Sequence, residues 1–488
     1  MTITKFTFSH PFDDDKLKEE CGVFGVIGMS DASNFVALGL HALQHRGQEA
    51  GGIVAYDATG GFNSARRFGY VRDNFTSKSL MSTLPGALSI GHVRYSTAGS
   101  KHAAIRDVQP FFGEFSMGGA AIAHNGNITN AEALRRELIE RGSIFQSSSD
   151  TECIIHLMAR SLQQNIPERM ADALRRVEGE FSIVAMTDQK LIGVRDPMGM
   201  RPLVLGRLAD GWVLSSETCA LDIIGAEFIR EVAPGEMVVI SEKGLESHFP
   251  FRKRASKFCI FEHVYFSRPD SIVSGRSVYE TRRQIGVELA KESPVEADLV
   301  CPVPDSGTPA AIGFSQHSGI PYAMGIIRNQ YMGRTFIEPT DQIRNMGVRL
   351  KLNVNRSLIE GKRVILVDDS VVRGTTSRKI KDMVLDAGAK EVHFRIASPP
   401  TAWPCFYGVD TPEREKLLAA TMSEEEMRQH LSVNSLKFIS LDGLYRAVGE
   451  AEGRNKECPQ YCDACFSGQY PIAPSDMLNK GFRLEAAQ

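Results

Sequence analysis

The stretch that most constrains the fold of this chain is residues 364–376, which read Val-Ile-Leu-Val-Asp-Asp-Ser-Val-Val-Arg-Gly-Thr-Thr. An apolar run, two acids, a short loop and a helical pattern together predict a buried strand, a turn and a helix N-terminus. The free N–H groups and positive dipole end of such a helix bind phosphate. Carboxylates at the strand end suit ribose hydroxyls or a hydrated Mg²⁺ ion. The stretch therefore predicts a site for a phosphorylated sugar, and it is not a Walker A loop because no lysine follows Gly374.

Length and composition indicate an ordinary multi-domain globular protein. A chain of 488 residues predicts two or three domains, and its 42% hydrophobic and 24% charged residues are typical of that class. The formal net charge of −3 gives no reason to expect a nucleic-acid partner. We find no apolar run long enough to cross a membrane and no secretory signal in the acidic leader. Nine cysteines in so long a chain favour reduced thiols and a cytoplasmic location.

The second half of the chain alternates strand-like and helix-like segments. A helical pattern at 279–291 precedes a strand-like run at 299–304, and segments 362–369, 377–387 and 391–397 complete a β-α-β unit. Such alternation predicts a parallel sheet with its ligand at the carboxyl ends of the strands.

The first half has more strands and fewer helices. A helical pattern covers 35–44, and Asn130 and Asp150 are each expected to begin a further helix. Many strands with a few helices predict layered sheets covered by helices. The strand-like runs are 21–28, 51–56, 88–94, 120–124, 181–187, 191–195, 202–206, 212–216 and 236–240.

Four short motifs in the first half point to one chemistry. They are Cys21-Gly-Val-Phe-Gly, His45-Arg-Gly-Gln-Glu, Gly91-His-Val-Arg-Tyr-Ser-Thr and His124-Asn-Gly-Asn. Taken singly, each has an ordinary structural interpretation, such as a turn at Asn-Gly or a small buried cysteine. As a set they resemble the class II glutamine amidotransferases, which are N-terminal-nucleophile hydrolases with a four-layered αββα fold.

This resemblance implies the roles of the site residues within a domain at 21–250. Cys21 would be the nucleophile, and the other residues would form an oxyanion hole, bind the amino-acid end of glutamine, or support the site. They are Asn125 and Gly126 for the oxyanion hole, Arg94, Thr97 and Asp150 for glutamine, and Arg46 in support. In this family the base is the α-amino group of the nucleophilic cysteine, which an internal residue lacks. We therefore expect residues 1–20 to be a propeptide that is removed.

The stretch that opened this section resembles the phosphoribosyl pyrophosphate (PRPP) signature of type I phosphoribosyltransferases. The resemblance implies a parallel-sheet domain at 258–455, with one Mg²⁺ ion per subunit near Ser306, Asp368 and Asp369. A polar strand exit remains the structural alternative for the two aspartates. The implied PRPP-binding residues are Asp305, Ser306, Gly307, Thr308, Asp368, Asp369, Arg373, Gly374, Thr375, Thr376 and Ser377. Residues 328–351 resemble a loop that closes over the site.

The whole chain resembles the amidophosphoribosyltransferase family nearly from end to end. The resemblance implies two domains, one α+β and one α/β: an αββα sandwich followed by a parallel-sheet phosphoribosyltransferase. Ammonia released from glutamine would attack PRPP to give 5-phosphoribosylamine, pyrophosphate and glutamate, the first committed step of purine synthesis. The family also implies an enclosed route for ammonia, feedback inhibition by purine nucleotides and a homotetramer.

The cysteine pattern alone leaves several kinds of site open. Cys462-Asp-Ala-Cys465 suits a redox pair, half a zinc site or a cluster site. The resemblance extends to the iron–sulfur, propeptide-processed branch of the family. It implies one structural [4Fe–4S] cluster per subunit, which would tie a tail at 456–488 to the second domain through Cys259, Cys405, Cys462 and Cys465. Cys153, Cys219 and Cys301 are expected to be buried apolar residues. Cys458 lies close to the ligand cysteines in sequence but is not expected to be a ligand.

Two rival interpretations are weaker. Another class II amidotransferase, such as a hexosamine-phosphate synthase, would lack the pattern at 364–376. A non-enzymatic PRPP-sensing regulator would need neither Cys21 nor an oxyanion hole, and would carry a DNA-binding module that we do not find.

Overall fold

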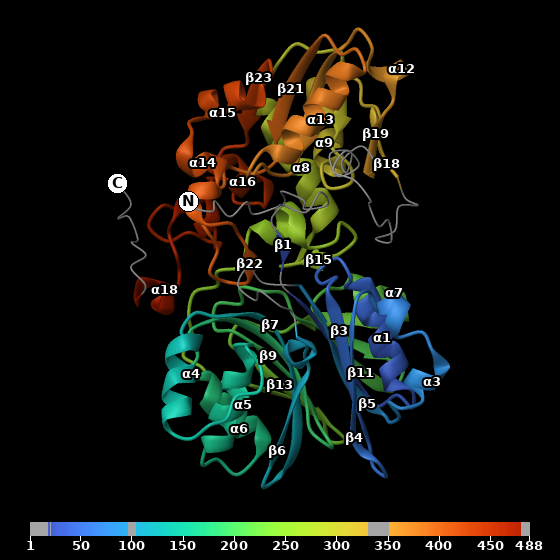
Figure 1. Ribbon diagram of the computed structural model, residues 1–488, viewed down its shortest axis with the longest axis vertical. Helices are drawn as coiled ribbons and strands as arrows, with labels where there is room; N and C mark the ends of the chain where they lie inside the picture. Colours follow the sequence, from blue (N-terminus) through green and yellow to red (C-terminus); the bar gives the residue numbers. More distant parts are fainter. Residues whose placement is uncertain (1–17, 20, 96–103, 330–350, 480–488) are drawn as a thin grey trace, which may run out of the picture. The chain divides into compact units, whose positions relative to one another are not determined.

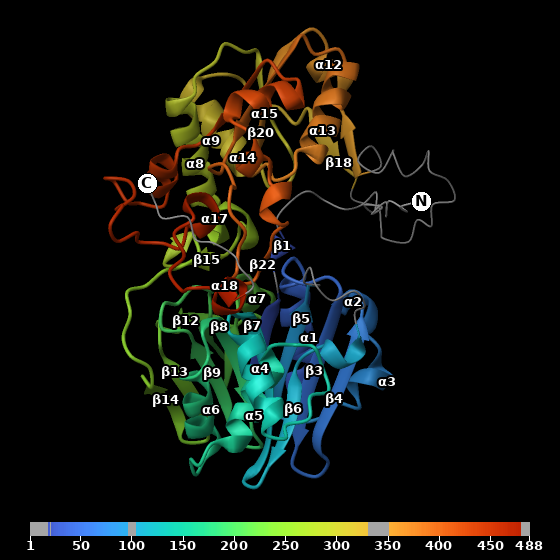
Figure 2. The same cartoon turned by 60° about the vertical axis from the view of Figure 1, so that its left-hand side comes forward.

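The computed structural model describes residues 18–19, 21–95, 104–329 and 351–479, which form two compact units (Figures 1 and 2). The N-terminal unit contains Lys18–Val278, Cys405–Thr411 and residues 456–479. The C-terminal unit contains Tyr279–Pro404 and Pro412–Asn455. Thr97 and most of the expected closing loop lie outside the described residues.

The N-terminal unit is built on two antiparallel sheets. One has seven strands in the order β12-β10-β11-β2-β5-β3-β4, and the other has six in the order β14-β13-β9-β8-β7-β6. The first sheet contains β2 (Gly22–Ile27), β3 (Ala50–Asp57), β4 (Gly61–Phe68), β5 (Leu88–Arg94), β10 (Val204–Leu208), β11 (Gly211–Ser215) and β12 (Glu227–Glu231). The second contains β6 (Phe111–Phe115), β7 (Gly118–Ile128), β8 (Gly179–Met186), β9 (Leu191–Arg195), β13 (Met237–Ser241) and β14 (Gly244–His248).

Helices cover the outer face of each sheet, which gives four layers (Figure 1). Helices α1 (Ala32–Ala42) and α7 (Cys219–Ile224) pack on the seven-stranded sheet. Helices α4 (Ala131–Glu140), α5 (Thr151–Arg160) and α6 (Ile166–Leu174) pack on the six-stranded sheet. A third apolar core, with Val23, Ile90, Val184 and Leu214, lies between the sheets. Strand β8 is buried at every residue because both of its faces are covered.

The N-terminal unit also contains several smaller elements. Strand β1 (Lys18–Glu19) pairs with β22 (Val409–Asp410), and a turn of π-helix covers Glu262–Phe266. The others are α2 (Val71–Asn74), α3 (Lys78–Met81), a 3-10 turn at Ile105–Asp107, β15 (Ile272–Val273), β16 (Arg276–Ser277), α17 (Ala464–Ser467) and α18 (Ser475–Asn479).

The C-terminal unit has a four-stranded parallel sheet in the order β17-β20-β21-β23. Its strands are β17 (Leu299–Pro302), β20 (Arg363–Asp368), β21 (Glu391–Ile396) and β23 (Ser435–Phe438). The helices are α8 (Val278–Glu292), which begins in the N-terminal unit, α9 (Thr308–Ser318), α12 (Arg356–Ile359), α13 (Thr375–Asp386), α14 (Leu418–Thr421), α15 (Glu424–Leu431) and α16 (Leu441–Ala447). A 3-10 turn covers Arg414–Lys416, and β18 (Ile326–Arg328) pairs with β19 (Leu352–Val354). None of the described helices is long and apolar enough to span a membrane.

The structure confirms the layered first half and the parallel sheet of the second, and it differs from the sequence expectation in two places. Residues 258–278, 405–411 and 456–479 group with the N-terminal unit, whereas we assigned 258–455 to the second domain and expected the tail to join it. The bonds that attach them are Cys259 N to the Met200 carbonyl oxygen at 3.0 Å, Asn127 Nδ2 to the Phe406 carbonyl oxygen at 2.8 Å, and Asp476 N to the Thr129 carbonyl oxygen at 3.0 Å. Asn130 begins α4 but does not cap it with its side chain, because that side chain bonds the backbone of Arg176 and Glu178.

Candidate active sites

Strands β2, β5 and β7, which carry three of the four sequence motifs, bring Cys21 and Asn125 to one end of the paired sheets. Gly22 of β2 pairs with Val93 of β5, so Cys21 lies next in register to Arg94. His92 of β5 then contacts the His124 carbonyl oxygen through Nε2, at 3.2 Å, just before Asn125 in β7. This contact connects the two sheets at the end of β5 where the candidate nucleophile lies.

Asn125 and Gly126 have the geometry of a ligand site. The Asn125 side chain is fully buried, and neither of its polar atoms has a hydrogen-bond partner among the described residues. A buried amide without hydrogen bonds costs free energy, and a bound ligand that bonds its polar atoms removes that cost. Gly126 has φ of 146°, and a side chain there would collide with the Glu180 carbonyl oxygen. Only glycine fits at this position, which directly follows the buried amide of Asn125.

The candidate glutamine-binding residues lie at the neighbouring strand ends. Arg94 is buried at the end of β5, and its Nη1 has no hydrogen-bond partner within the described part of the chain. Its Nε is 3.8 Å from Glu49 Oε2, which is an ion-pair distance and too long for a hydrogen bond. Asp150 begins α5 and accepts the N–H of Ile128 at 2.9 Å, two residues beyond Gly126. The structure therefore places both candidates around the β7 end.

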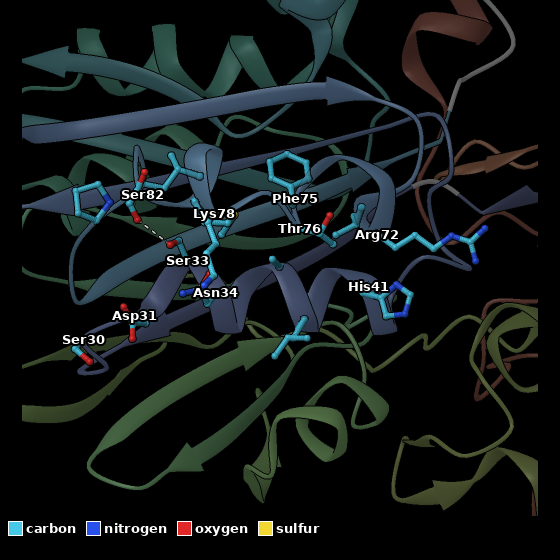
Figure 3. Close-up of a pocket in the computed structure, with 16 residues that line it drawn as sticks. Ser30, Asp31, Ser33, Asn34, His41, Arg72, Phe75, Thr76, Lys78 and Ser82 are labelled. Atoms are coloured by element: carbon cyan, nitrogen blue, oxygen red, sulfur yellow. Dashed lines mark hydrogen bonds between the residues drawn. The ribbon is translucent and has the colours of Figure 1, made fainter.

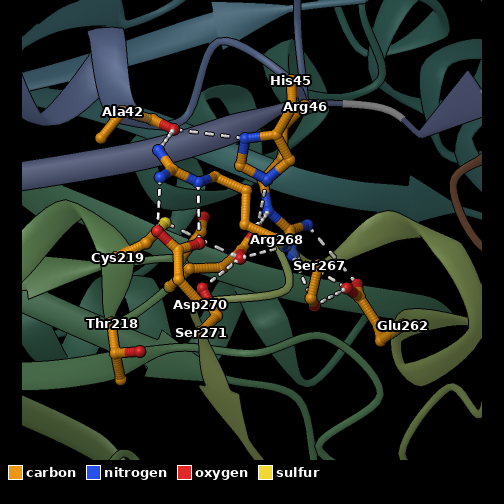
Figure 4. A network of polar contacts seen from close by, with 12 residues as sticks. Ala42, His45, Arg46, Thr218, Cys219, Glu262, Ser267, Arg268, Asp270 and Ser271 are labelled. Carbon is orange, nitrogen blue, oxygen red and sulfur yellow. Dashed lines mark hydrogen bonds and ion pairs between the residues drawn. The ribbon is translucent and has the colours of Figure 1, made fainter. Parts of the chain in front are cut away.

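Arg46 lies in a buried ion network rather than in an open pocket (Figure 4). It donates to Glu217 Oε1 and, at 2.8 Å, to Glu262 Oε2. Burial would raise the pKa of Glu217, but Arg46 and His45 outweigh it and hold that pKa below its usual range. Arg46 thus supports the fold behind Cys21, since its side chain also packs near Gly22.

The same network continues to β8 through Arg201. Arg201 bonds Glu262 Oε1 at 3.1 Å and Glu180 Oε1 at 2.8 Å. Burial raises the pKa of Glu180 to about 8, against the opposing effect of Arg201. Because each charge is buried and paired, removing a single partner would leave its neighbour uncompensated. No sequence pattern indicates this network, because its members come from separate segments of the chain, between 21 and 216 residues apart.

The C-terminal unit assembles its candidate site at the end of β20. Asp368 and Asp369 are buried, and the Asp369 N–H bonds Asp368 Oδ1 at 2.9 Å. The chain then turns at Gly374, which has φ of 76° and precedes the first turn of α13. Asp368, Gly374, Thr376 and Ser377 line one small hollow together with residues 370–372. A helix N-terminus facing buried carboxylates suits a phosphorylated sugar.

The loop from Asp305 to Thr308 lies beside that turn. Strand β17 runs parallel to β20, and Val303 N bonds the Val367 carbonyl oxygen at 2.8 Å, so both loops leave the same edge of the sheet. Asp305 is exposed and pairs with Arg328 Nη1 at 2.8 Å. Of the remaining candidates, Arg373 and Thr375 are exposed at the surface of the turn.

Four thiols gather in the N-terminal unit. The backbones of Cys259 and Cys462 pair in an isolated parallel β-bridge. The Tyr407 N–H donates to Cys405 Sγ at 3.3 Å. Burial raises the pKa of Cys465, and Cys259, Cys405 and Cys462 raise it further, so the four sulfurs lie within reach of one another's charge. No three His, Cys, Asp or Glu side chains among the described residues are arranged to hold a metal ion. Cys153, Cys219 and Cys301 are buried as expected, and Cys458 is exposed.

A hollow of about 750 Å³ lies apart from these residues, against α1 and the α2–α3 segment (Figure 3). Phe75, Met81 and Leu84 contribute to its apolar lining, and His41, Arg72 and Lys78 to its polar lining. None of the candidate catalytic or PRPP-binding residues lines it.

Comparisons with known proteins agree over most of the chain. Residues 92–222 match the family model of the glutamine amidotransferase domain. The amidophosphoribosyltransferase of Rhizobium etli is 55% identical over 472 residues, which are 96% of this chain and 94% of that protein. The amidophosphoribosyltransferase of Bacillus subtilis is 46% identical over 93% of this chain and 94% of its own length. The solved structure of the B. subtilis glutamine PRPP amidotransferase, complexed with ADP and GMP, superposes with a TM-score of 0.87 at 44% identity, over 93% of this chain and 98% of that one.

Proposed function

The chain belongs to the amidophosphoribosyltransferase family, and from that premise we propose how its residues divide the reaction between the two units. The enzyme hydrolyses glutamine and transfers the released ammonia to PRPP. The N-terminal unit holds the glutamine half-reaction and the C-terminal unit the phosphoribosyl half-reaction. The observation that carries the assignment of the first is the buried, unpartnered amide of Asn125 beside Gly126 in β7.

In the glutamine half-reaction the thiol of Cys21 attacks the side-chain amide carbon. The carbonyl oxygen becomes an oxyanion, which the Asn125 side chain and the Gly126 N–H stabilise. Ammonia leaves with the proton that the base took from the thiol, and water then releases glutamate from the thioester. Arg94 pairs with the α-carboxylate of glutamine, while Thr97 and Asp150 hold its amino-acid end.

The leader Met1–Glu20 is removed to complete this site. An amide nitrogen at Cys21 is not a base, whereas a free α-amino group with a pKa near 8 is partly neutral at working pH. Leader removal therefore supplies the proton acceptor next to the sulfur. The domains we propose are 21–250 for the glutamine half-reaction and 258–455 for the phosphoribosyl half-reaction. Residues 258–278 and 405–411 of the second, like the tail from 456, group with the N-terminal unit.

In the phosphoribosyl half-reaction the turn after β20 binds PRPP. Residues 373–377 hold the 5′-phosphate, Asp368 and Asp369 face the ribose, and residues 305–308 bind the pyrophosphate. Ammonia bonds to C1 as the C1–pyrophosphate bond breaks, and the carboxylates stabilise the positive charge that develops on the ring. A Mg²⁺ ion near Ser306, Asp368 and Asp369 would neutralise charge on the departing pyrophosphate.

The four gathered thiols support one [4Fe–4S] cluster per subunit. The cysteines of a cluster attach to separate irons, so they need not converge on one ion. Cys259, Cys405, Cys462 and Cys465 support this assignment because they are close enough for each to raise the pKa of Cys465 or to be raised with it. We place the enzyme in the iron–sulfur, propeptide-processed branch of its family, in the cytoplasm, as a homotetramer. Purine nucleotides are its proposed inhibitors, supported by the ADP and GMP in the B. subtilis structure.

The test of the division between units is Cys21→Ala. We expect it to abolish glutamine-dependent formation of 5-phosphoribosylamine and to leave ammonia-dependent formation at the wild-type rate. Loss of both activities would refute the separation of the half-reactions. Intact mass of the active enzyme checks leader removal, and full glutaminase activity in an uncleaved chain would refute the proposed base.

Iron and acid-labile sulfide analysis of anaerobically purified protein tests the cluster. We expect four irons and four sulfides per chain, and loss of both in Cys405→Ser. Zinc in place of iron and sulfide would refute the cluster assignment.

A further inference from the structure

We propose that residues 405–408, the loop that begins with Cys405, form the rear wall of the oxyanion hole, and that Asn127 and Gly408 are positioning residues for Gly126. This inference rests on the proposed roles of Cys21, Asn125 and Gly126. All of the residues involved lie in the N-terminal unit.

Asn127 provides the first connection. It follows Gly126 in β7, and its Nδ2 donates to the Phe406 carbonyl oxygen at 2.8 Å. The two residues are 279 positions apart in the sequence, so this bond fixes a distant loop to the end of the oxyanion strand. A side-chain amide bonded to a backbone carbonyl holds direction as well as distance.

Gly408 provides the second connection, by direct contact. A Cβ atom at this position would lie 3.5 Å from the Gly126 carbonyl carbon, 2.8 Å from Glu180 Oε1 and 3.3 Å from Arg201 Nη2. Gly408 also has φ of 98°, which side chains disfavour. A methyl group at Gly408 would therefore be in van der Waals contact with Gly126 and would collide with Glu180 Oε1, the residue that pairs with Asn127 next to Gly126.

Arg201 provides the third connection, between the loop and Glu180. Its Nη2 donates to the Tyr407 carbonyl oxygen at 2.8 Å, and its Nε holds Glu180, which pairs with Asn127 across β7 and β8. The loop is thus bonded at two successive carbonyls and packed at a third residue. Movement of residues 405–408 would be transmitted to the Gly126 N–H, whose direction sets the stabilisation of the oxyanion.

Two substitutions, each with a matched control, test this. Asn127→Ala removes the bond to Phe406. Asn130→Ala removes a similar side chain whose partners within the described part of the chain are Arg176 and Glu178. Gly408→Ala adds the colliding methyl group, and Gly244→Ala adds one at the same backbone angle, φ of 99°, where nothing lies within 4 Å. The controls therefore carry the intrinsic cost of each change without the contact.

The measurements separate positioning of the oxyanion hole from general damage. We expect both test variants to lower kcat for glutamine hydrolysis by about tenfold or more, with KM changed less than about threefold, because a displaced oxyanion donor acts only in the transition state. Alkylation of Cys21 by iodoacetamide, followed by mass spectrometry, forms no oxyanion and should keep the rate of the controls. Ammonia-dependent activity should also match the controls.

The inference is overturned if kcat stays within twofold of the controls, or if alkylation falls in parallel with hydrolysis. If Gly408→Ala does not fold, Asn127→Ala decides the question by the same readouts. If an otherwise unchanged enzyme still hydrolyses glutamine after Cys21→Ala, that result would instead refute the proposed glutaminase site itself.

Discussion

His92 is predicted to make the stability of the N-terminal unit depend on pH. Its imidazole is fully buried, and Nδ1 has no hydrogen-bond partner among the described residues. Burial, together with the nearby charge of Arg94, lowers the pKa of His92 to about 3. The folded protein therefore holds this imidazole neutral in the pH range where an exposed histidine takes up a proton.

The direction and the size of this pH effect on stability follow from the difference between the pKa of His92 in the folded and in the unfolded protein. The folded pKa lies below the unfolded value of 6.5, so the stabilisation is present above pH 6.5 and is lost as pH falls toward 3. At pH 5 the unfolded chain gains about 2 kcal/mol from protonating this group, whereas the folded chain gains almost nothing. His92→Gln removes the titrating group and keeps an N–H that can reach the His124 carbonyl oxygen.

Urea unfolding at pH 7.5 and pH 5 measures the effect. Trp212 reports on the N-terminal unit in a Trp403→Phe background, since the chain has two tryptophans. Wild type should lose about 2 kcal/mol more than His92→Gln between the two pH values. His248→Gln, which removes an exposed histidine of the same unit, is the control. If the difference between wild type and His92→Gln does not change with pH, the buried histidine is not held neutral and the reasoning fails.

Two further predictions concern single contacts. Asp476 accepts the N–H groups of Glu132 and Ala133 at the start of α4, at 2.7 and 3.2 Å, so Asp476→Ala should cost about 1 kcal/mol locally and speed amide exchange there about fivefold. Unchanged exchange at those two amides would show that Asp476 is not the cap. Gly374→Ala places a methyl group 2.6 Å from Leu418 Cδ1 at φ of 76°, and it should raise KM for PRPP with either nitrogen source. A PRPP KM equal to that of wild type would refute the role of this turn.

Local patterns predicted most of the fold. Apolar runs gave strands close to β3, β5, β8, β9, β10, β11 and β13, and the Gly374 turn was found from its own thirteen residues. Strands β4, β6, β12 and β14 were not predicted, because they lie at or near sheet edges and carry polar or exposed residues. Hydrophobic periodicity weakens wherever one side of a strand is open to solvent.

Long-range contacts account for what the sequence did not reveal. Asn130 has the residue type of a helix cap, yet the capping oxygen comes from Asp476, 344 residues beyond Glu132. The buried carboxylate partners of Arg46 are 171 and 216 residues away, and those of Arg201 are 21 and 61 residues away. Charge alone does not indicate which carboxylate will be buried. The rival interpretations were settled by similarity across nearly the whole chain, which neither a hexosamine-phosphate synthase nor a regulator would show.

The grouping of residues 405–411 and 456–479 with the N-terminal unit has a consequence for synthesis on the ribosome. The half of the protein that is translated first is completed last, because Cys405 and Phe406 emerge after residues 279–404 of the C-terminal unit, and Cys462, Cys465 and the Asp476 cap emerge only after all of that unit. A nascent chain that ends before residue 405 exposes the back of β7 and the first turn of α4. An expressed fragment that ends near residue 257 would therefore correspond to an assembly intermediate rather than to an independent domain.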